Sequence, residues 1–445
     1  MSTKSSSGHS ILGTIFVIGL LVGLIGLGVF LSRFLELVET LGHNIPQNNL
    51  SLDYVTALVW AIALGTSILF WPVPFKDKKS LLLIWLVRVL VALGFMLLYE
   101  AHYPGLDSYD YFTRATLMNF PWHVEQSLGT HIITVLAWLN QQVIPASYHA
   151  TKISFSMVGL IALYIFYRAA VIFLQREDNR VFYVLSLFPT ILFWSSVLGK
   201  EPIILLGIAL YTYGVVGMYQ FKKKHFLVIL LLGVMISMMI RLWMGPILIA
   251  PLIIIILYLR SQSVIFKVVG IVLVSTMFFL SMNYFKDYFR FESTDDVLEF
   301  SSNLSQSWAI GGSAQVLNTE LTTISSISVF LPLGMFTALF RPMPGEFLSN
   351  PYAVMASLDN LGLLLLLGLA LKRKCWRELR KPLIMWATLL VVLWAVFYAP
   401  VSYQNLGTAM RYKLQILPVF LGLLLYLAQP RTKILSIHRD KFEAS

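Results

Sequence analysis

The chain has 445 residues, of which 58% are hydrophobic and only 12% are charged, and its mean hydropathy is +0.76. These values lie outside the range of soluble globular domains and exclude a fold that is mainly solvated by water. A net charge of +11 is compatible with nucleic-acid binding. The basic residues, however, lie in short segments between apolar runs, where the positive-inside bias of membrane proteins explains them, so we expect no nucleic-acid partner.

Apolar runs long enough to cross a hydrocarbon core of about 30 Å recur along the chain. They predict an all-α, polytopic transmembrane fold, because an open sheet edge could not satisfy its backbone hydrogen bonds in lipid. About 12 spans are expected, within a range of 11–14. The predicted spans are residues 11–31, 54–73, 81–99, 152–174, 181–198, 202–220, 226–240, 243–259, 264–282, 355–371, 382–399 and 412–428.

The first run, residues 11–31, is longer than the apolar region of a usual signal peptide and no small-residue cleavage site ends it, so we expect a retained helix. The single cysteine, Cys375, lies in the basic segment 372–381 and excludes a disulfide within the chain.

The distribution of Lys and Arg predicts that both termini are cytoplasmic, because most basic residues then fall at the inner ends of spans. Residues 322–340 are also apolar enough to cross, but a crossing there would move the basic segment 372–381 outside. We therefore expect a re-entrant or interfacial helix at 322–340. Re-entrant backbone at membrane depth needs cover from protein or a watery cavity, so this assignment predicts a cavity.

Two long loops are expected outside, and they divide the chain into four parts. Within the first outer loop, residues 108–120 and 128–144 suit helices that lie at the membrane interface. The four parts are two additional N-terminal transmembrane helices (1–80), a transmembrane core with the outer loop 100–151 (81–282), a large outer loop with the re-entrant or interfacial helix (283–354), and the C-terminal transmembrane helices with a cytoplasmic tail (355–445).

Charged residues gather at the outer ends of separate predicted helices. Ionisable groups at membrane depth cost about 2.5–3.5 kcal/mol each, so they usually line a cavity and mark function. The acidic candidates for catalysis are Asp107, Asp110, Glu201 and Glu346, and the basic candidates for substrate binding are Lys200, Arg241, Arg341 and Arg411. Their common side predicts one outward-opening site.

Structural explanations compete with this functional one. Lys200 and Glu201 could form a turn between two helices, with the following proline at the first helical position. Arg241 could extend its charged end to the interface, Arg411 could anchor a helix end, and Arg341 could pair with Glu346 as loop architecture.

Among the acidic residues, Asp107 is the stronger candidate, because it follows a Pro-Gly pair at the exit of a span. Asp110 could lie on the exposed face of the next short helix. The histidines of this loop, His102, His123 and His131, lack a metal-ligand spacing.

An acidic residue that faces arginines across an outer cavity suits sugar transfer from a lipid-linked donor. The carboxylate can take the proton of an acceptor hydroxyl or bind a divalent cation, while Arg and Lys hold the phosphate of the donor. No metal ligands can be named from the sequence, and a divalent cation such as Mg²⁺ or Mn²⁺ is the one candidate cofactor. The lipid tail would lie between helices.

Four segments carry a family resemblance: GLDSYDYF at 105–112, SSVLGKEP at 195–202, LFRPMPGE at 339–346 and GTAMRYKLQILP at 407–418. With the architecture of residues 82–428, the chain resembles the GT-C class of integral-membrane glycosyltransferases and the related Wzy-type and EpsG-type polysaccharide polymerases of bacterial envelopes.

The resemblance implies that Asp107 is the acidic residue of the first outer loop and that Arg241, Arg341 and Arg411 hold polyprenyl phosphates. The chain departs from the GT-C pattern in two respects. Two additional helices precede the acidic loop, and the paired acidic motif is spread over Asp107 and Asp110.

We expect an enzyme that transfers a sugar or a growing glycan from an undecaprenyl-phosphate carrier, at the outer face of a bacterial inner membrane, in the assembly of cell-envelope polysaccharide. Its partners would be the lipid-linked donor, a glycan acceptor and membrane lipids. A Wzy-type polymerase is the near alternative. A flippase or transporter would need charges along a path through both leaflets, but among the basic residues only Arg88 and Arg168 lie within the predicted spans and away from the span ends. A scaffolding subunit would leave the charged helix ends unexplained.

Overall fold

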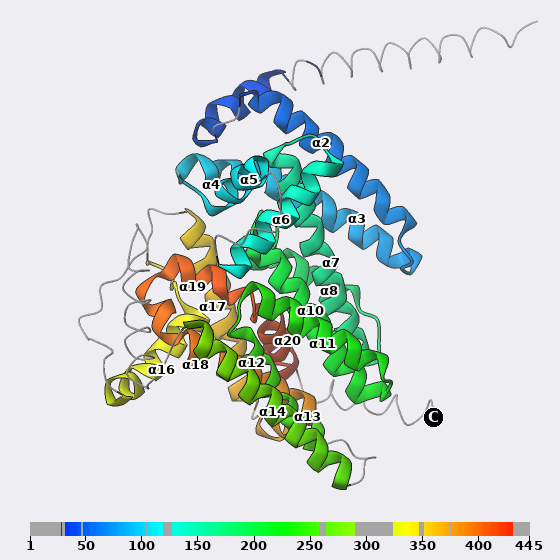
Figure 1. The fold of residues 1–445 in the computed structure, drawn as a ribbon, viewed down its shortest axis with the longest axis vertical. Coiled ribbons are helices and arrows are strands. Elements are labelled where there is room, and N and C mark those ends of the chain that lie inside the picture. The colour runs from blue at the N-terminus through cyan, green and yellow to red at the C-terminus, as the bar shows by residue number, and fades with distance from the viewer. Residues whose placement is uncertain are drawn as a thin grey trace, which may run out of the picture.

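A computed structural model describes residues 28, 32–45, 48–103, 105–118, 127–257, 264–289, 324–346, 351–373 and 375–429. Within these ranges the ordered elements are helices and no β-strand is present, which confirms the all-α class (Figure 1). Most of the first predicted span, the acidic stretch at 292–299, His123 and the C-terminal tail lie outside the described residues.

Six helices of the described chain are long and apolar enough to cross a membrane, which makes this a membrane protein. The first two are composite: Leu50–Phe70 consists of α2 (Leu50–Ser67) and the 3₁₀ turn Ile68–Phe70, and Phe75–His102 consists of α3 (Phe75–Leu90), a π-helical turn (Val91–Phe95) and α4 (Met96–His102). The next two are single helices, α7 (Tyr148–Leu174) and α10 (Lys200–Phe221). The last two are Val354–Lys372 within α17 (Pro351–Lys372) and Pro382–Pro400 within α18 (Pro382–Gln404).

A seventh span is possible near the C-terminus. There α19 (Leu406–Lys413) and α20 (Leu417–Leu427) together are long enough to cross, but they meet at a bend of 73°. Each of these long helices coincides with one predicted apolar run. The fuller number of about 12 spans stays a prediction.

The remaining predicted runs in the described chain are helical, but their apolar parts are shorter or broken, as in α11 (His225–Ile240), α14 (Val264–Phe289, apolar over Lys267–Leu280) and α16 (Ile324–Phe340). Residues 181–198 form two helices, α8 (Asn179–Leu187) and α9 (Pro189–Trp194), because Phe188 before the proline is extended. Residues 243–259 likewise divide into α12 (Met244–Ile249) and α13 (Leu252–Leu257), with Pro251 between them.

Two helices are present where the sequence predicted them in the first long loop, as α5 (Asp107–Leu117) and α6 (Leu128–Val143), and they pack on one another. Their position at the membrane interface stays a prediction. On α5, Tyr111 and Phe112 are buried, whereas Asp110 and Arg114 are exposed. The helix therefore lies with one side against the protein.

α7 and α10 lie at the centre of the molecule, and α11 packs along the outer side of α10 (Figure 1). α10 and α11 approach closely because small residues face each other: a Cβ on Gly233 would lie 2.3 Å from the backbone nitrogen of Tyr211. Such small-residue contacts are the usual way in which membrane helices pack. Arg88 is also buried here, where its guanidinium donates to the carbonyl oxygens of Ser156 and Ser195.

α10 and α11 form an antiparallel pair, which determines where their charged ends lie. α10 begins at Lys200 and ends at Phe221, and α11 returns along it to end at Ile240. Arg241 is therefore brought back to the end of the pair that holds Lys200 and Glu201. The basic residues Lys222, Lys223 and Lys224 lie at the opposite end.

Candidate functional site

Arg411 is held between two carboxylates that come from distant parts of the chain. Its Nη1 lies 2.6 Å from Oδ2 of Asp107 on α5, and its Nε lies 2.5 Å from Oε1 of Glu201 on α10. Glu201 is almost fully buried, whereas the side chain of Asp107 is 60% exposed. We call Asp107, Lys200, Glu201, Arg241 and Arg411 the charged cluster.

Arg241 approaches Glu201 from the other side, with Nη2 3.6 Å from Oε1, and its side chain is buried. Its guanidinium lies 3.7 Å from the centre of the Tyr412 ring, a cation–π contact. Tyr398 hydroxyl lies 3.5 Å from Nη1 and accepts a hydrogen bond from Trp243. Arg241 is thus held in place by aromatic side chains, and it does not extend outward to the interface.

Lys200 begins α10 and donates a hydrogen bond of 2.9 Å to the hydroxyl of Thr130 on α6. Gly199 precedes it, and a Cβ at this position would lie 2.7 Å from Oε2 of Glu201. The glycine therefore leaves room for the buried carboxylate at the start of the helix. Pro202 is the third residue of α10 and not the first helical residue as expected, because the helix already begins at Lys200, and this start places Glu201 between two arginines.

Arg341 and Glu346 form a second group beside the charged cluster. Arg341 Nη2 lies 2.6 Å from Oε1 of Glu346, whose other oxygen accepts from the Met343 backbone. Lys413, two residues after Arg411, donates to the carbonyl oxygen of Arg341 at 3.1 Å and to Asn360 at 2.7 Å. The two groups are connected through α19, and no ion pair between their side chains is present in the described chain.

Asp110 is not part of the cluster. It pairs with Arg114 on the same helix at 2.7 Å, and both side chains are about half exposed, at 49% and 46%. This is the arrangement expected of a solvated helix face. Of the eight predicted residues, the structure brings five together, places Arg341 and Glu346 in the adjacent group, and leaves Asp110 apart.

The pKa values of Asp107 and Glu346 follow from their partners. Burial raises the pKa of Asp107, but the charge and hydrogen bond of Arg411 and the charge of Lys200 outweigh it, so the pKa lies below the usual 3.8. For Glu346, burial is likewise outweighed by hydrogen bonds from Arg341 and the Met343 backbone, and its pKa lies below 4.5. Both groups are carboxylates at neutral pH.

Several contributing residues were missed from the sequence. Tyr398, Tyr412 and Thr130 contact the cluster, but aromatic and hydroxyl residues are too common in this chain to be singled out. Lys152 could have been singled out from the sequence, because a lysine at the start of an apolar run is unusual. It is buried and paired with Glu100 at 2.8 Å, and Tyr148 donates to the same carboxylate at 2.7 Å.

No group of three or more His, Cys, Asp or Glu side chains that could hold a metal ion is present in the part of the chain that the structure describes. In the charged cluster the two carboxylates share Arg411, so a cation already lies between them. We assign no residue to a divalent cation.

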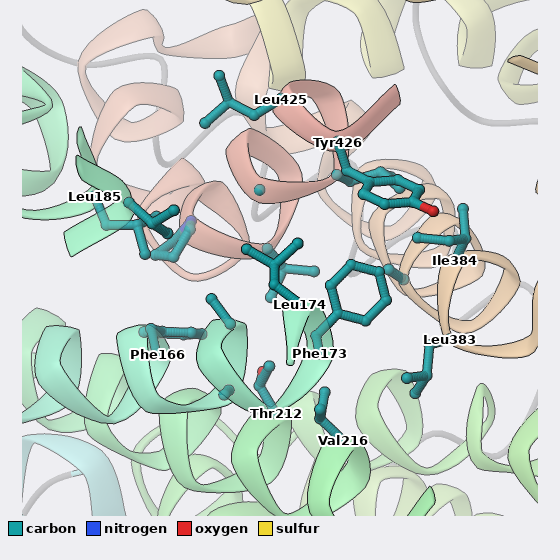
Figure 2. Close-up of a pocket in the computed structure, with 18 of the residues that line it drawn as sticks. Phe166, Phe173, Leu174, Leu185, Thr212, Val216, Leu383, Ile384, Leu425 and Tyr426 are labelled. Carbon is teal, nitrogen blue, oxygen red and sulfur yellow. The ribbon is translucent and has the colours of Figure 1, made fainter. Parts of the chain in front are cut away.

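Two cavities lie away from the charged cluster. One of about 370 Å³, with a mixed polar and apolar wall, lies along α5 on the side of Tyr109 and Thr113, with Asp53 and Ser147 in its wall. An apolar one of about 160 Å³ lies between the far ends of the long helices (Figure 2).

Comparison with known proteins found no matching protein family, no matching curated protein and no matching solved structure. The geometry of the charged cluster is therefore the observation from which a function is inferred.

Proposed function

We propose that the protein is an integral-membrane glycosyltransferase that moves a sugar or a growing glycan from a polyprenyl-phosphate carrier to an acceptor. The observation that supports this proposal is the charged cluster, in which Arg411, Arg241 and Lys200 lie close to Asp107 and Glu201 at one end of the helix bundle. Charge of this density is expensive near lipid and is usually functional there. We place this end at the outer face of a bacterial inner membrane.

Arg411 is suited to exchange one partner for another. Its bond to Asp107 is on the exposed side of the cluster, while its bond to Glu201 is buried. A phosphate can accept the same parallel N–H donors as a carboxylate. We infer that the donor phosphate takes the place of Asp107 on Arg411, with Lys200 beside it, while Glu201 keeps the guanidinium oriented.

This exchange would also activate Asp107. While paired with Arg411 its pKa is low, which makes it a weak base. Once released beside a bound phosphate it would lose that cation and gain a like-charged neighbour, and both changes raise a carboxyl pKa. Asp107 would then take the proton of the acceptor hydroxyl, as that oxygen attacks the anomeric carbon and the carrier phosphate leaves.

Charges elsewhere in the described spans have partners within the protein and give a transporter less support. Lys152 and Glu100, for example, form a buried ion pair at 2.8 Å. Arg88 donates its hydrogen bonds to backbone carbonyls and a serine hydroxyl in the protein interior. Arg168 lies near the C-terminal end of α7, and its Nη1 is 3.4 Å from Oε1 of Glu177. A Wzy-type polymerase remains close to the proposal, since it uses the same donor, and the length of the products distinguishes the two.

The test uses matched substitutions on one helix. Asp107→Asn should lower turnover by about 10²–10⁴-fold, the usual contribution of a general base, while binding of the polyprenyl-linked donor stays close to normal. Asp110→Asn, on the same helix but outside the cluster, should keep full activity. Transfer is measured with purified protein in nanodiscs, with folding checked by size exclusion, with and without a metal chelator.

Arg411→Ala should instead weaken donor binding, because a phosphate contact is made in the ground state, and Arg411→Lys should not restore it fully. Full activity of Asp107→Asn, or normal donor binding by Arg411→Ala, would overturn the proposal.

A further inference from the structure

The apolar cavity lies at the end of the bundle opposite the charged cluster. Figure 2 shows Phe166, Phe173 and Leu174 of α7 facing Leu383 and Ile384 of α18 across it, with Tyr426 of α20 beside them. α10 also borders it through Val216, near the end of the helix that is far from Lys200. The cavity therefore belongs to the opposite leaflet, which by our orientation is the inner one.

The wall of this cavity is almost entirely hydrocarbon, which suits an apolar chain and not a sugar or a nucleotide. The indole of Trp386 is already satisfied, because its N–H donates to the hydroxyl of Tyr211 at 2.9 Å. Gly422 adds open space on α20, since a Cβ there would meet no atom within 4 Å. An acyl chain would pack against this hydrocarbon surface. Thr212 and Gln429 also line the cavity, and the described residues offer no hydrogen-bond partner to their buried oxygens Oγ1 and Oε1.

Basic residues lie at the mouth of the cavity. Tyr426 lines it, and its hydroxyl is 3.1 Å from Lys381 and 2.8 Å from Glu378. Lys381 directly precedes the first turn of α18, which supplies Leu383 and Ile384 to the wall. Further exposed basic side chains come from the same connecting segment: Lys372, Arg377 and Arg380.

We propose that this cavity binds one acyl chain of an anionic phospholipid of the inner leaflet, whose phosphate contacts the basic segment 372–381. The argument is complementarity: an apolar cavity for the chain opens beside a basic segment for the headgroup. Basic residues near a membrane surface contribute about 1 kcal/mol each to the attraction of anionic lipid. This binding site is independent of the charged cluster.

The test is photolabelling of the full-length protein in phosphatidylcholine nanodiscs. The probe is a trace of phosphatidylglycerol with a diazirine on one acyl chain, and the comparison probe is the matching phosphatidylcholine. We expect the phosphatidylglycerol probe to label segments 166–174, 383–387 and 418–426 more strongly. Lys381→Gln should reduce that preference about fivefold, the loss expected for one basic residue near the surface.

Filling the cavity provides the matched pair of variants. Gly422→Leu should abolish most labelling of these segments. Gly368→Leu, also at a glycine whose Cβ would meet no atom within 4 Å but on the exposed side of α17, should leave labelling unchanged. If Gly422→Leu does not fold, Ala387→Leu fills the same space from α18.

Equal labelling by the two probes, or unchanged labelling of Gly422→Leu, would overturn the proposal. So would displacement of the probe by undecaprenyl phosphate but not by unlabelled phosphatidylglycerol, which would assign the cavity to a different lipid.

Discussion

Glu201 is the residue on which the charged cluster depends, because it is buried and lies next to two arginines. Glu201→Gln should lower the free energy of unfolding by about 3–5 kcal/mol, since removal of one partner leaves buried charge uncompensated. The control is Glu346→Gln, whose carboxylate is 30% exposed and whose loss should change the unfolding free energy by about 1 kcal/mol or less. Unfolding in detergent micelles measures both, and equal effects would contradict this assignment.

The pH dependence of Asp107 follows from its ion pair with Arg411. Because its pKa is lowered in the folded protein, the stability that this pair adds is fully present above the unfolded pKa of about 3.8 and is lost as pH falls through the lower folded value. Arg411→Gln should therefore raise the pH at which Asp107 protonates. Infrared titration of the carboxyl band shows this directly, and Asp107→Asn identifies the band. An unchanged midpoint would mean that Arg411 does not set this pKa.

For individual residues, the sequence predicted which charged residues would lie close together, but not which of them would form pairs. The alternation of predicted spans placed these residues on one predicted side of the membrane, and that was enough to select Asp107, Glu201 and Arg411. Their pairing depends on contacts across 304 and 210 residues, which no local pattern encodes. Asp110 could not be separated from Asp107 with certainty until the helix faces of α5 were known.

Among the elements, α10 and α11 approach each other closely at glycines of both helices. Gly233→Ala should destabilise the protein by about 1–3 kcal/mol, because its Cβ would lie 2.3 Å from the Tyr211 nitrogen and the helices must separate. Gly368→Ala should be neutral or stabilising, since its Cβ meets nothing and alanine favours the helix by about 1 kcal/mol. Thermal unfolding of the two variants compares them, and shifts of the same sign would contradict this account.

Helix positions were predicted well where the chain is continuously apolar. The run 202–220 is helix Lys200–Phe221, and the run 152–174 is helix Tyr148–Leu174. Breaks were not predicted, because hydropathy averages over them: Pro189 begins a new helix, and the last two helices bend by 73°. Helices α7 and α10 are surrounded by neighbours, so they carry little periodicity from which a facing side could be derived.

For the whole molecule, the membrane topology is the arrangement on which the two proposed sites depend. α11 has 16 residues, or about 24 Å at 1.5 Å per residue. It nevertheless runs back along α10 from the Lys222–Lys224 end to the charged cluster. If α10 crosses the membrane, α11 therefore returns across it.

Cysteine labelling of intact cells, in a Cys375→Ser background, tests this topology at three exposed positions. Ser127→Cys should react with an impermeant reagent from outside, while Lys223→Cys and Trp376→Cys should react only after the membrane is opened. Three crossings separate the first position from the second, through α7, the broken pair α8 and α9, and α10. Four should separate the second from the third, provided that α16 does not cross. Outside labelling of Trp376→Cys alone would make α16 a full span, whereas outside labelling of Lys223→Cys would reverse α10 and place the charged cluster on the cytoplasmic face, where an outward-facing transferase could not use it.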